Sequence, residues 1–242
     1  MEILPILNKI KYNSIIQASV HVTAVVAIIV FALIEIRIPM ISIFRDTKLE
    51  LLLSNQKFSD AISSILSSII AAYVFYIIVD WVPKRRKRRE TKYVLNSLIA
   101  SVLDAYRRER VFGHETAIQY VDRKCLEKLW LDAQIILLSK NESHYLALKF
   151  AVETADSRLE DFRNALPLAM QLSPERSLHW LMIIDKIRLL AEYYSNLPSI
   201  PQDSIHLINR NDESNPVQQF KANMNFRFLE IIEEVRIWLF SI

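Results

Sequence analysis

The sequence contains almost no glycine and a single cysteine. Gly113 is the only glycine among 242 residues, although tight hairpins, bulges and phosphate-binding loops depend on glycine. A β-rich fold and a glycine-rich nucleotide loop are therefore disfavoured. Cys125 is the only cysteine, which excludes an intrachain disulfide and a thiolate metal cluster built by one chain. We expect Cys125 to be a core residue in a reducing compartment.

Two long stretches of the sequence have no formal charge. Between Lys11 and Glu35 lie 23 uncharged residues, and between Asp60 and Asp80 lie 19 more, whereas a bilayer core needs about 20 residues of helix. The sequence predicts membrane-spanning helices at 15–36 and 61–82, the second ended by Pro83. The first stretch is too long for a signal peptide and has no small-residue cleavage site. It is therefore interpreted as an anchor.

The basic residues are concentrated just after the second predicted span. Because runs of cations stay on the cytoplasmic side, both termini are predicted to be cytoplasmic and the loop 37–60 periplasmic. Residues 1–83 would then form a transmembrane hairpin and residues 84–242 a cytoplasmic domain. The run should also bind anionic membrane lipids, and direct nucleic-acid binding is disfavoured, because a polyanion would lie against a negative surface. The run consists of Lys84, Arg85, Arg86, Lys87, Arg88 and Arg89.

Polar residues inside the predicted spans are costly in hydrocarbon and usually face protein or water. Their spacing places Ser14, Gln17 and His21 on one face of the first helix. Ser64 and Ser68 lie on a ridge of small residues that lets another helix approach closely. We predict that these five residues form a polar seam and that the chain forms a homo-oligomer. Helix packing is favoured over a water-lined pore, and His21 would titrate, bond across an oligomer or reach the interface.

The predicted cytoplasmic domain has helical periodicity almost throughout. The pattern predicts an all-α bundle of about five helices, at 91–112, 115–139, 143–166, 173–194 and 217–240. The helix 91–112 either starts anew or continues the second span. In the second helix, Cys125, Leu129, Ala133 and Ile136 are expected to form a buried stripe. The helix 173–194 is apolar nearly all round, which predicts a central position or a face covered by another subunit.

Catalytic and metal-binding patterns are sparse. We find no spacing of His, Cys, Asp or Glu typical of a metal site, and we expect no metal, no cofactor and no enzymatic activity. The exception is Arg108 followed by His114, a separation that resembles the ribonuclease motif of HEPN domains, which are also helical bundles. Gly113 would break the helix that this motif occupies.

The stretch from Tyr73 to Arg88, Tyr-Val-Phe-Tyr-Ile-Ile-Val-Asp-Trp-Val-Pro-Lys-Arg-Arg-Lys-Arg, resembles one in small bacterial two-span proteins, some of them effectors in anti-phage loci. The resemblance implies an inner-membrane effector of abortive infection. Its cytoplasmic domain would receive a signal or bind a sensor protein or complex, and its membrane helices would oligomerise and perturb the membrane. Two alternatives stay open: a membrane-anchored HEPN-like ribonuclease, and a non-catalytic anchor that recruits a cytoplasmic complex. The sequence does not identify the signal, the partner or the stoichiometry.

Overall fold

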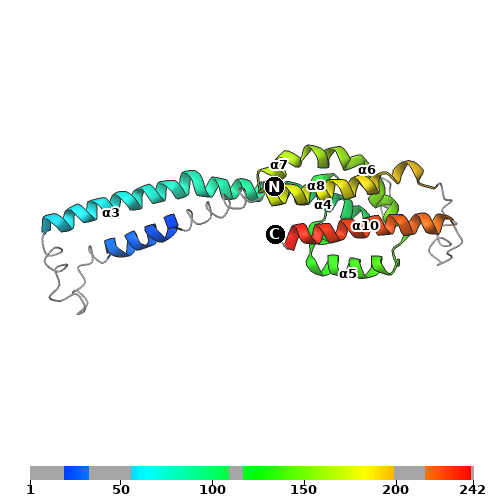
Figure 1. Cartoon of the computed structure of the whole chain (residues 1–242), viewed down its shortest axis with the longest axis horizontal. Coiled ribbons are helices and arrows are strands. Elements are labelled where there is room, and N and C mark those ends of the chain that lie inside the picture. The colour runs from blue at the N-terminus through cyan, green and yellow to red at the C-terminus, as the bar shows by residue number, and fades with distance from the viewer. Residues whose placement is uncertain (1–18, 33–55, 109–116, 199–215, 241–242) are drawn as a thin grey trace, which may run out of the picture. The chain divides into compact units, whose positions relative to one another are not determined.

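The chain is described by a computed structural model that places residues 19–32, 56–108, 117–198 and 216–240. It divides into two compact units, Met1–Arg85 and Arg86–Ile242. The predicted domain boundary after residue 83 lies just before this division. The described residues are helical with no strand among them, which confirms the all-α prediction (Figure 1).

The first unit contains the helix Ser19–Ala32, the helix α3 (Gln56–Tyr76) and a π-helix, Ile77–Trp81. In the helix Ser19–Ala32, Ala24 and Ala27 are buried, and small side chains such as these allow two helices to approach closely. The half-buried residues of α3 recur at helical spacing, at Ile62, Leu66, Ile70 and Tyr73. Side chains of the two helices meet at His21 and Tyr73.

One described helix, Asp60–Arg108, is long and apolar enough to cross a membrane by length and composition. The described part of the first helix, Ser19–Ala32, is apolar but shorter. The two-span hairpin therefore stays a prediction. Within the predicted loop 37–60, residues 56–60 are helical, because α3 begins at Gln56.

Pro83 does not end the helix, contrary to expectation. The helix α4 (Val82–Arg108) follows the π-helix directly and contains Pro83 in its first turn. Proline is tolerated in the first turn of a helix, where its missing N–H costs little. The π-helix ends at Trp81, two residues before Pro83, and the chain continues as an α-helix through the proline.

The second unit is a bundle of α4 with α5 (Lys128–Ser139), α6 (Tyr145–Asn164), α7 (Leu166–Met170), α8 (Pro174–Ala191) and α10 (Pro216–Phe240). In Figure 1, α6, α8, α10 and α5 lie side by side in this order. The helix α4 contributes a nearly continuous run of buried residues from Leu95 to Tyr106. The ring of Tyr106 stacks on Phe228 of α10 at 4.4 Å between centroids. A helix buried on most of its circumference is the centre of the bundle.

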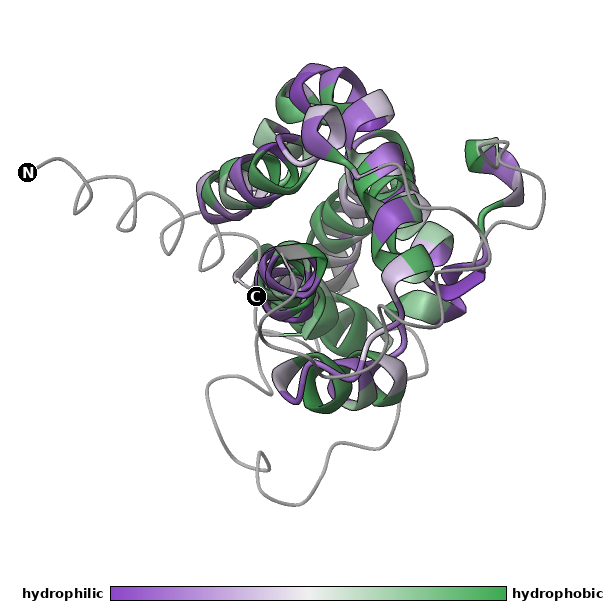
Figure 2. Ribbon diagram, turned by 90° about the vertical axis from the view of Figure 1, so that its right-hand side faces the viewer, coloured by the Kyte–Doolittle hydropathy of each residue, from purple (hydrophilic) through white to green (hydrophobic). Residues whose placement is uncertain are grey.

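The core is reinforced by aromatic rings from three helices. Phe162 of α6 stacks on Trp180 of α8, and Trp180 packs against Trp238 of α10, each at 5.5 Å between centroids. The indole Nε1 of Trp180 donates to the backbone carbonyl of Phe162 at 3.1 Å, so its polar group is satisfied. Figure 2 shows hydrophobic and hydrophilic residues alternating along the bundle helices, as expected of amphipathic helices.

The predicted helix 115–139 is wrong in its first half and in its buried face. The described part contains two 3-10 helices, Ile118–Tyr120 and Arg123–Leu126, before α5 begins. The side chain of Asp122 accepts a hydrogen bond from the backbone of Lys124, a local bond that competes with helix formation. Cys125 is buried as predicted, but Leu129 is 84% exposed and Ala133 and Ile136 are also exposed. The buried positions of α5 are Leu131 and Leu138.

The central position, one of the two alternatives predicted for 173–194, belongs to α4 instead. The helix α8 begins as predicted, with Ser173 accepting a hydrogen bond from the backbone N–H of Arg176. Its residues Leu178, Leu181 and Met182 are exposed. An apolar face covered by another subunit stays a prediction. The helices α6 and α10 confirm the predicted 143–166 and 217–240 to within a few residues.

Candidate functional site

The most specific polar contact in the first unit is between His21 and Tyr73. The imidazole Nδ1 of His21 lies 2.7 Å from the hydroxyl of Tyr73, a hydrogen bond whose donor depends on the histidine tautomer. The two rings also meet edge to face, with centroids 5.8 Å apart. This bond joins the two helices and pairs two half-buried polar groups with each other.

The π-helix brings a second ring to His21. In a regular α-helix, Trp81 would be turned by roughly 80° from Tyr73, because eight residues make about 2.2 turns. The backbone N–H of Val82 instead donates to the carbonyl of Ile77, five residues back, and such wider turns rotate less per residue. Trp81 therefore also faces His21, with ring centroids 6.2 Å apart. We call His21, Tyr73 and Trp81 the histidine–aromatic cluster.

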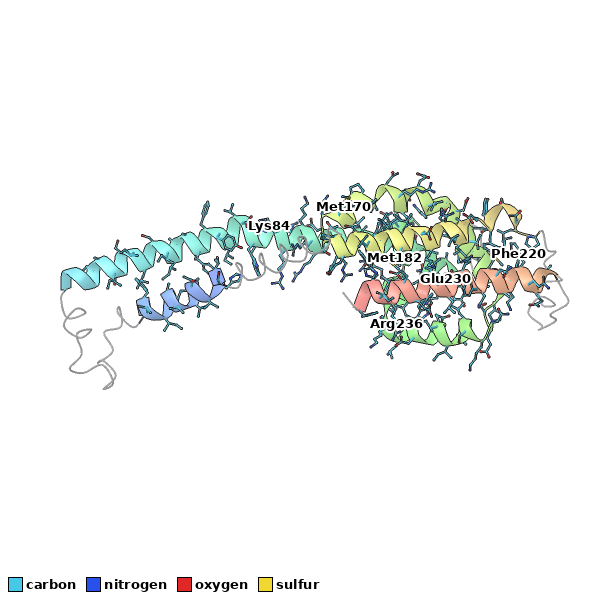
Figure 3. The ribbon with its side chains drawn as sticks, viewed as in Figure 1. Lys84, Met170, Met182, Phe220, Glu230 and Arg236 are labelled. Atoms are coloured by element: carbon cyan, nitrogen blue, oxygen red, sulfur yellow. The ribbon has the colours of Figure 1, made fainter. Side chains whose placement is uncertain are left out.

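The histidine–aromatic cluster leads into the basic run through Arg85. The Arg85 guanidinium lies 5.0 Å from the centroid of the Trp81 ring, a cation–π distance. One residue earlier, Lys84 forms an ion pair with Asp80 at 2.7 Å, and Figure 3 labels Lys84 at this point of the chain. The first two residues of the basic run are thus both in contact with side chains of the preceding π-helix.

The two serines of the predicted seam lie on another face of α3. Ser64 and Ser68 are exposed, and the Ser68 hydroxyl donates to the carbonyl of Ser64 at 2.9 Å. On a regular helix they are turned by about 180° and 140° from Tyr73, the partner of His21. One chain therefore does not bring His21 together with these serines. Ser14 and Gln17 lie outside the described residues, and a seam formed between copies stays a prediction.

All six residues of the basic run, 84–89, are exposed. Arg86 pairs with Glu90 at 2.8 Å, and both side chains remain largely solvent-accessible. Among the residues that the structure describes, Lys87, Arg88 and Arg89 have no ion-pair partner. Exposed pairs contribute little to stability, so the run keeps most of its positive potential.

Arg108 belongs to an ion-pair network at the end of α4. Its Nε donates to Asp104 at 3.0 Å, and Asp104 is nearly fully buried. Asp104 also accepts a hydrogen bond from the backbone N–H of Asp122 at 3.3 Å, and Arg107 pairs with Asp122 at 2.6 Å. Arg108 therefore has a structural role here. His114 lies outside the described residues, so the Arg108–His114 pair stays an open prediction.

The same network surrounds Cys125. The hydrogen bond from the Lys124 backbone, together with Arg107, holds the pKa of Asp122 below its usual range. Burial, together with the charges of Asp104 and Asp122, raises the pKa of the Cys125 thiol to about 12. Its Sγ donates to the carbonyl of Asp122 at 3.1 Å. A thiol in this state is a poor nucleophile at neutral pH.

The partners of His21 could not be found in the sequence. Tyr73 and Trp81 match the aromatic belt of a membrane interface, and that pattern alone explains their presence. Their contact with His21 depends on the register of two helices joined by a long connection. It also depends on a π-helical turn, which no residue pattern in the sequence predicts.

The described residues contain no group of three or more His, Cys, Asp or Glu arranged to hold a metal ion. No protein-family model, curated protein or solved structure matches the chain.

Proposed function

We propose that this chain is an inner-membrane effector, of the kind encoded in anti-phage loci, whose membrane helices rearrange and permeabilise the bilayer. Its helical bundle receives the signal or binds the sensor protein. The proposal is supported above all by the hydrogen bond between His21 and Tyr73, at 2.7 Å.

This hydrogen bond suggests two states of the membrane helices, one with His21 and Tyr73 paired and one with them separated. An unsatisfied polar group in hydrocarbon costs several kcal/mol. While His21 and Tyr73 are paired, the apolar helices have a closed and dry contact. When they separate, both groups need water or a polar group of another copy. A hydrated path is then less costly than two unpaired groups in lipid.

The exposed face of α3 is suited to contact between copies. It carries Ser64, Ser68 and Ala72, all exposed in one chain, and small residues at this spacing let helices approach closely. Self-association through this face would bring several histidine–aromatic clusters into one assembly.

The bundle has apolar surface that supports its role as a receiver. On α5, Leu129 and Ile136 are exposed, and on α8 Leu178 and Met182 are exposed. Leu178 and Met182 are four residues apart and share a face of α8, and exposed apolar residues grouped in this way often mark protein interfaces. The same surface supports a second candidate function, a non-catalytic anchor that recruits a cytoplasmic complex.

Three variants test the proposal when the chain is expressed at matched membrane levels. Tyr73→Phe removes only the hydroxyl that holds His21, so it should favour the open state and increase dye uptake. His21→Leu removes the polar group that a hydrated path needs, so it should abolish uptake. Tyr76→Phe is the matched control, because Tyr76 lies on the same helix and has no described hydrogen bond.

Opposite effects of Tyr73→Phe and His21→Leu, with Tyr76→Phe unchanged, would support a membrane-permeabilising effector. Equal behaviour of all three variants would remove the histidine–aromatic cluster from the mechanism. Growth arrest that persists without depolarisation, and is lost in Arg108→Ala with His114→Ala, would favour the ribonuclease. Recruitment of a cytoplasmic protein without dye uptake or RNA cleavage would favour the anchor.

A further inference from the structure

The cations of α4 surround the helix and do not line one side of it. Residues 84–89 are six consecutive positions, so they cover about 1.7 turns. All are exposed. Such a collar suits a helix that passes through a layer of headgroups, where anions surround it. A helix lying on a surface or in a nucleic-acid groove would instead have its cations on one face.

One face of the collar continues into the bundle. Arg88, Lys92 and Asn96 follow at intervals of four residues and therefore share a face of α4. The Asn96 side chain accepts a hydrogen bond from Nε1 of Trp238 at 2.9 Å. Trp238 lies near the end of α10, so this face of α4 is packed against that end.

A further cation from α8 lies at the same place. The guanidinium of Arg176 is 4.8 Å from the Trp238 ring centroid and donates to the Trp238 backbone carbonyl. Arg176 is 7% exposed. Partial burial, followed by the charges of Arg176 and Arg88, lowers the pKa of Lys92. Three cations from two helices therefore converge at this end of the bundle.

Among the described residues, the acidic groups that lie close to these cations in the sequence are Glu90 and Glu175. Glu90 pairs with Arg86, and Glu175 lies beside Arg176 on α8. Gathering like charges costs free energy, and this cost falls when an anion binds between them. Guanidinium and ammonium groups together are a typical phosphate-binding set.

We propose that Arg88 and Lys92, with Arg176 behind them, bind the phosphate of an anionic phospholipid and that this lipid stabilises the bundle. The inference rests on the membrane anchoring in the proposed function. The lipid source is favoured over a soluble phosphate because the uncharged stretch 61–79 precedes these residues closely in the sequence. An apolar helix of this length places the cations that follow it at headgroup level. The bundle would thereby sense the composition of the cytoplasmic leaflet.

The test uses the full chain in lipid nanodiscs, with thermal unfolding followed by tryptophan emission. The buried Trp180 and Trp238 report on the bundle core. Replacing part of the phosphatidylcholine with phosphatidylglycerol should raise the midpoint of the wild type by several degrees, because a ligand that binds only the folded state stabilises it. Lys92→Gln and Arg88→Gln should each lose at least half of this rise. Lys128→Gln, an exposed lysine on α5 without a described ion pair, should keep it.

Three results would overturn the inference. One is a wild type that gains nothing from phosphatidylglycerol. Another is a Lys92→Gln variant that keeps the whole rise in the unfolding midpoint. The rise would then come from non-specific attraction between the lipid and the cations 84–89. The third is an equal gain from inorganic phosphate in pure phosphatidylcholine discs, which would assign the site to a soluble anion. The measurement involves no permeability, so a chain that shows the lipid effect but admits no dye would refute only the proposed function. A chain that does not stay in the disc would refute both.

Discussion

Lys221 is a buried cation without a partner among the described residues, and replacing it should stabilise the protein. Its side chain is 2% exposed, and it shares the buried stripe of α10 with Met224, Asn225 and Phe228. Asn225 is satisfied, because it bonds the Ser143 hydroxyl at 2.5 Å and the Leu138 carbonyl at 2.6 Å. Burial lowers the pKa of Lys221.

The size of the effect follows from the cost of burying an unpaired polar group. Mutational data place this cost at about 1–3 kcal/mol. Methionine has a similar length and no charge, and such volume-conserving changes cost less than about 1.5 kcal/mol. We therefore expect Lys221→Met to stabilise the bundle by about 1–2 kcal/mol. For a chain of this size, the corresponding rise in Tm is roughly 2–4 °C per kcal/mol.

The pH dependence gives a second and independent check. Because the pKa of Lys221 is lower in the folded state, the unfolded chain binds more protons between the folded value and the ordinary 10.5. The free energy of unfolding of the wild type should therefore rise with pH in that window. The penalty is complete below the folded pKa and disappears as the pH approaches the ordinary value. Lys221→Met lacks this term, so its advantage should shrink from pH 7 toward pH 10.

The assay is thermal unfolding of the purified full chain in one detergent, followed by tryptophan emission at several pH values. Lys140→Met is the matched control, because Lys140 is exposed at the end of α5 and its replacement should change the midpoint little. A Lys221→Met variant less stable than the wild type at pH 7 would refute the reasoning. A stability difference that does not change with pH would also refute it, since it would show that the ammonium is compensated in the fold.

The other predictions concern reactivity, topology and assembly. Cys125 should resist alkylation in the native protein at pH 8 and react fully in denaturant, and fast native labelling would contradict its burial. In a Cys125→Ala background, Ile43→Cys should react with an impermeant reagent from the periplasm; protection there would refute the predicted topology. Ser64→Leu with Ser68→Leu should shift the detergent-solubilised oligomer toward monomer, and an unchanged sedimentation profile would exclude this face of α3 from assembly.

Helix positions could be predicted where periodicity and end signals agree. The helix α8 begins at Pro174 with Ser173 as its cap, as this pair of residue types indicates. The segment around Asp122 was mispredicted because its apolar spacing also fits one long helix. The Asp122 side chain there accepts a hydrogen bond from the backbone N–H of Lys124, two residues later, and the spacing of apolar residues gives no sign of such a bond.

The position of a helix in the bundle depends on how the helices pack together, and not on the composition of that helix alone. The helix α8 has more apolar residues around its circumference, yet Leu178, Leu181 and Met182 remain exposed. The helix α4 includes Ser97, Ser101 and Asp104 but buries all three. Its serines bond carbonyls of the preceding turn, at 2.8 Å for Ser97 and 2.6 Å for Ser101. Polar residues that satisfy themselves within one helix can therefore be buried at low cost.

The same reasoning separates Arg176 and Lys221, the two buried cations among the described residues of the bundle. Arg176 and Lys221 each interrupt an apolar stripe, at the start of α8 and early in α10. Arg176 donates to the backbone carbonyl of Trp238 and lies over the Trp238 ring, near the C-terminal end of α10, where the helix dipole favours a cation. Lys221 is buried in α10 without an ion pair or hydrogen bond among the described residues, and burial lowers its pKa. The contacts within reach of each side chain therefore make one buried charge a structural contact and the other a cost, and the Lys221→Met measurement is a direct test of that difference.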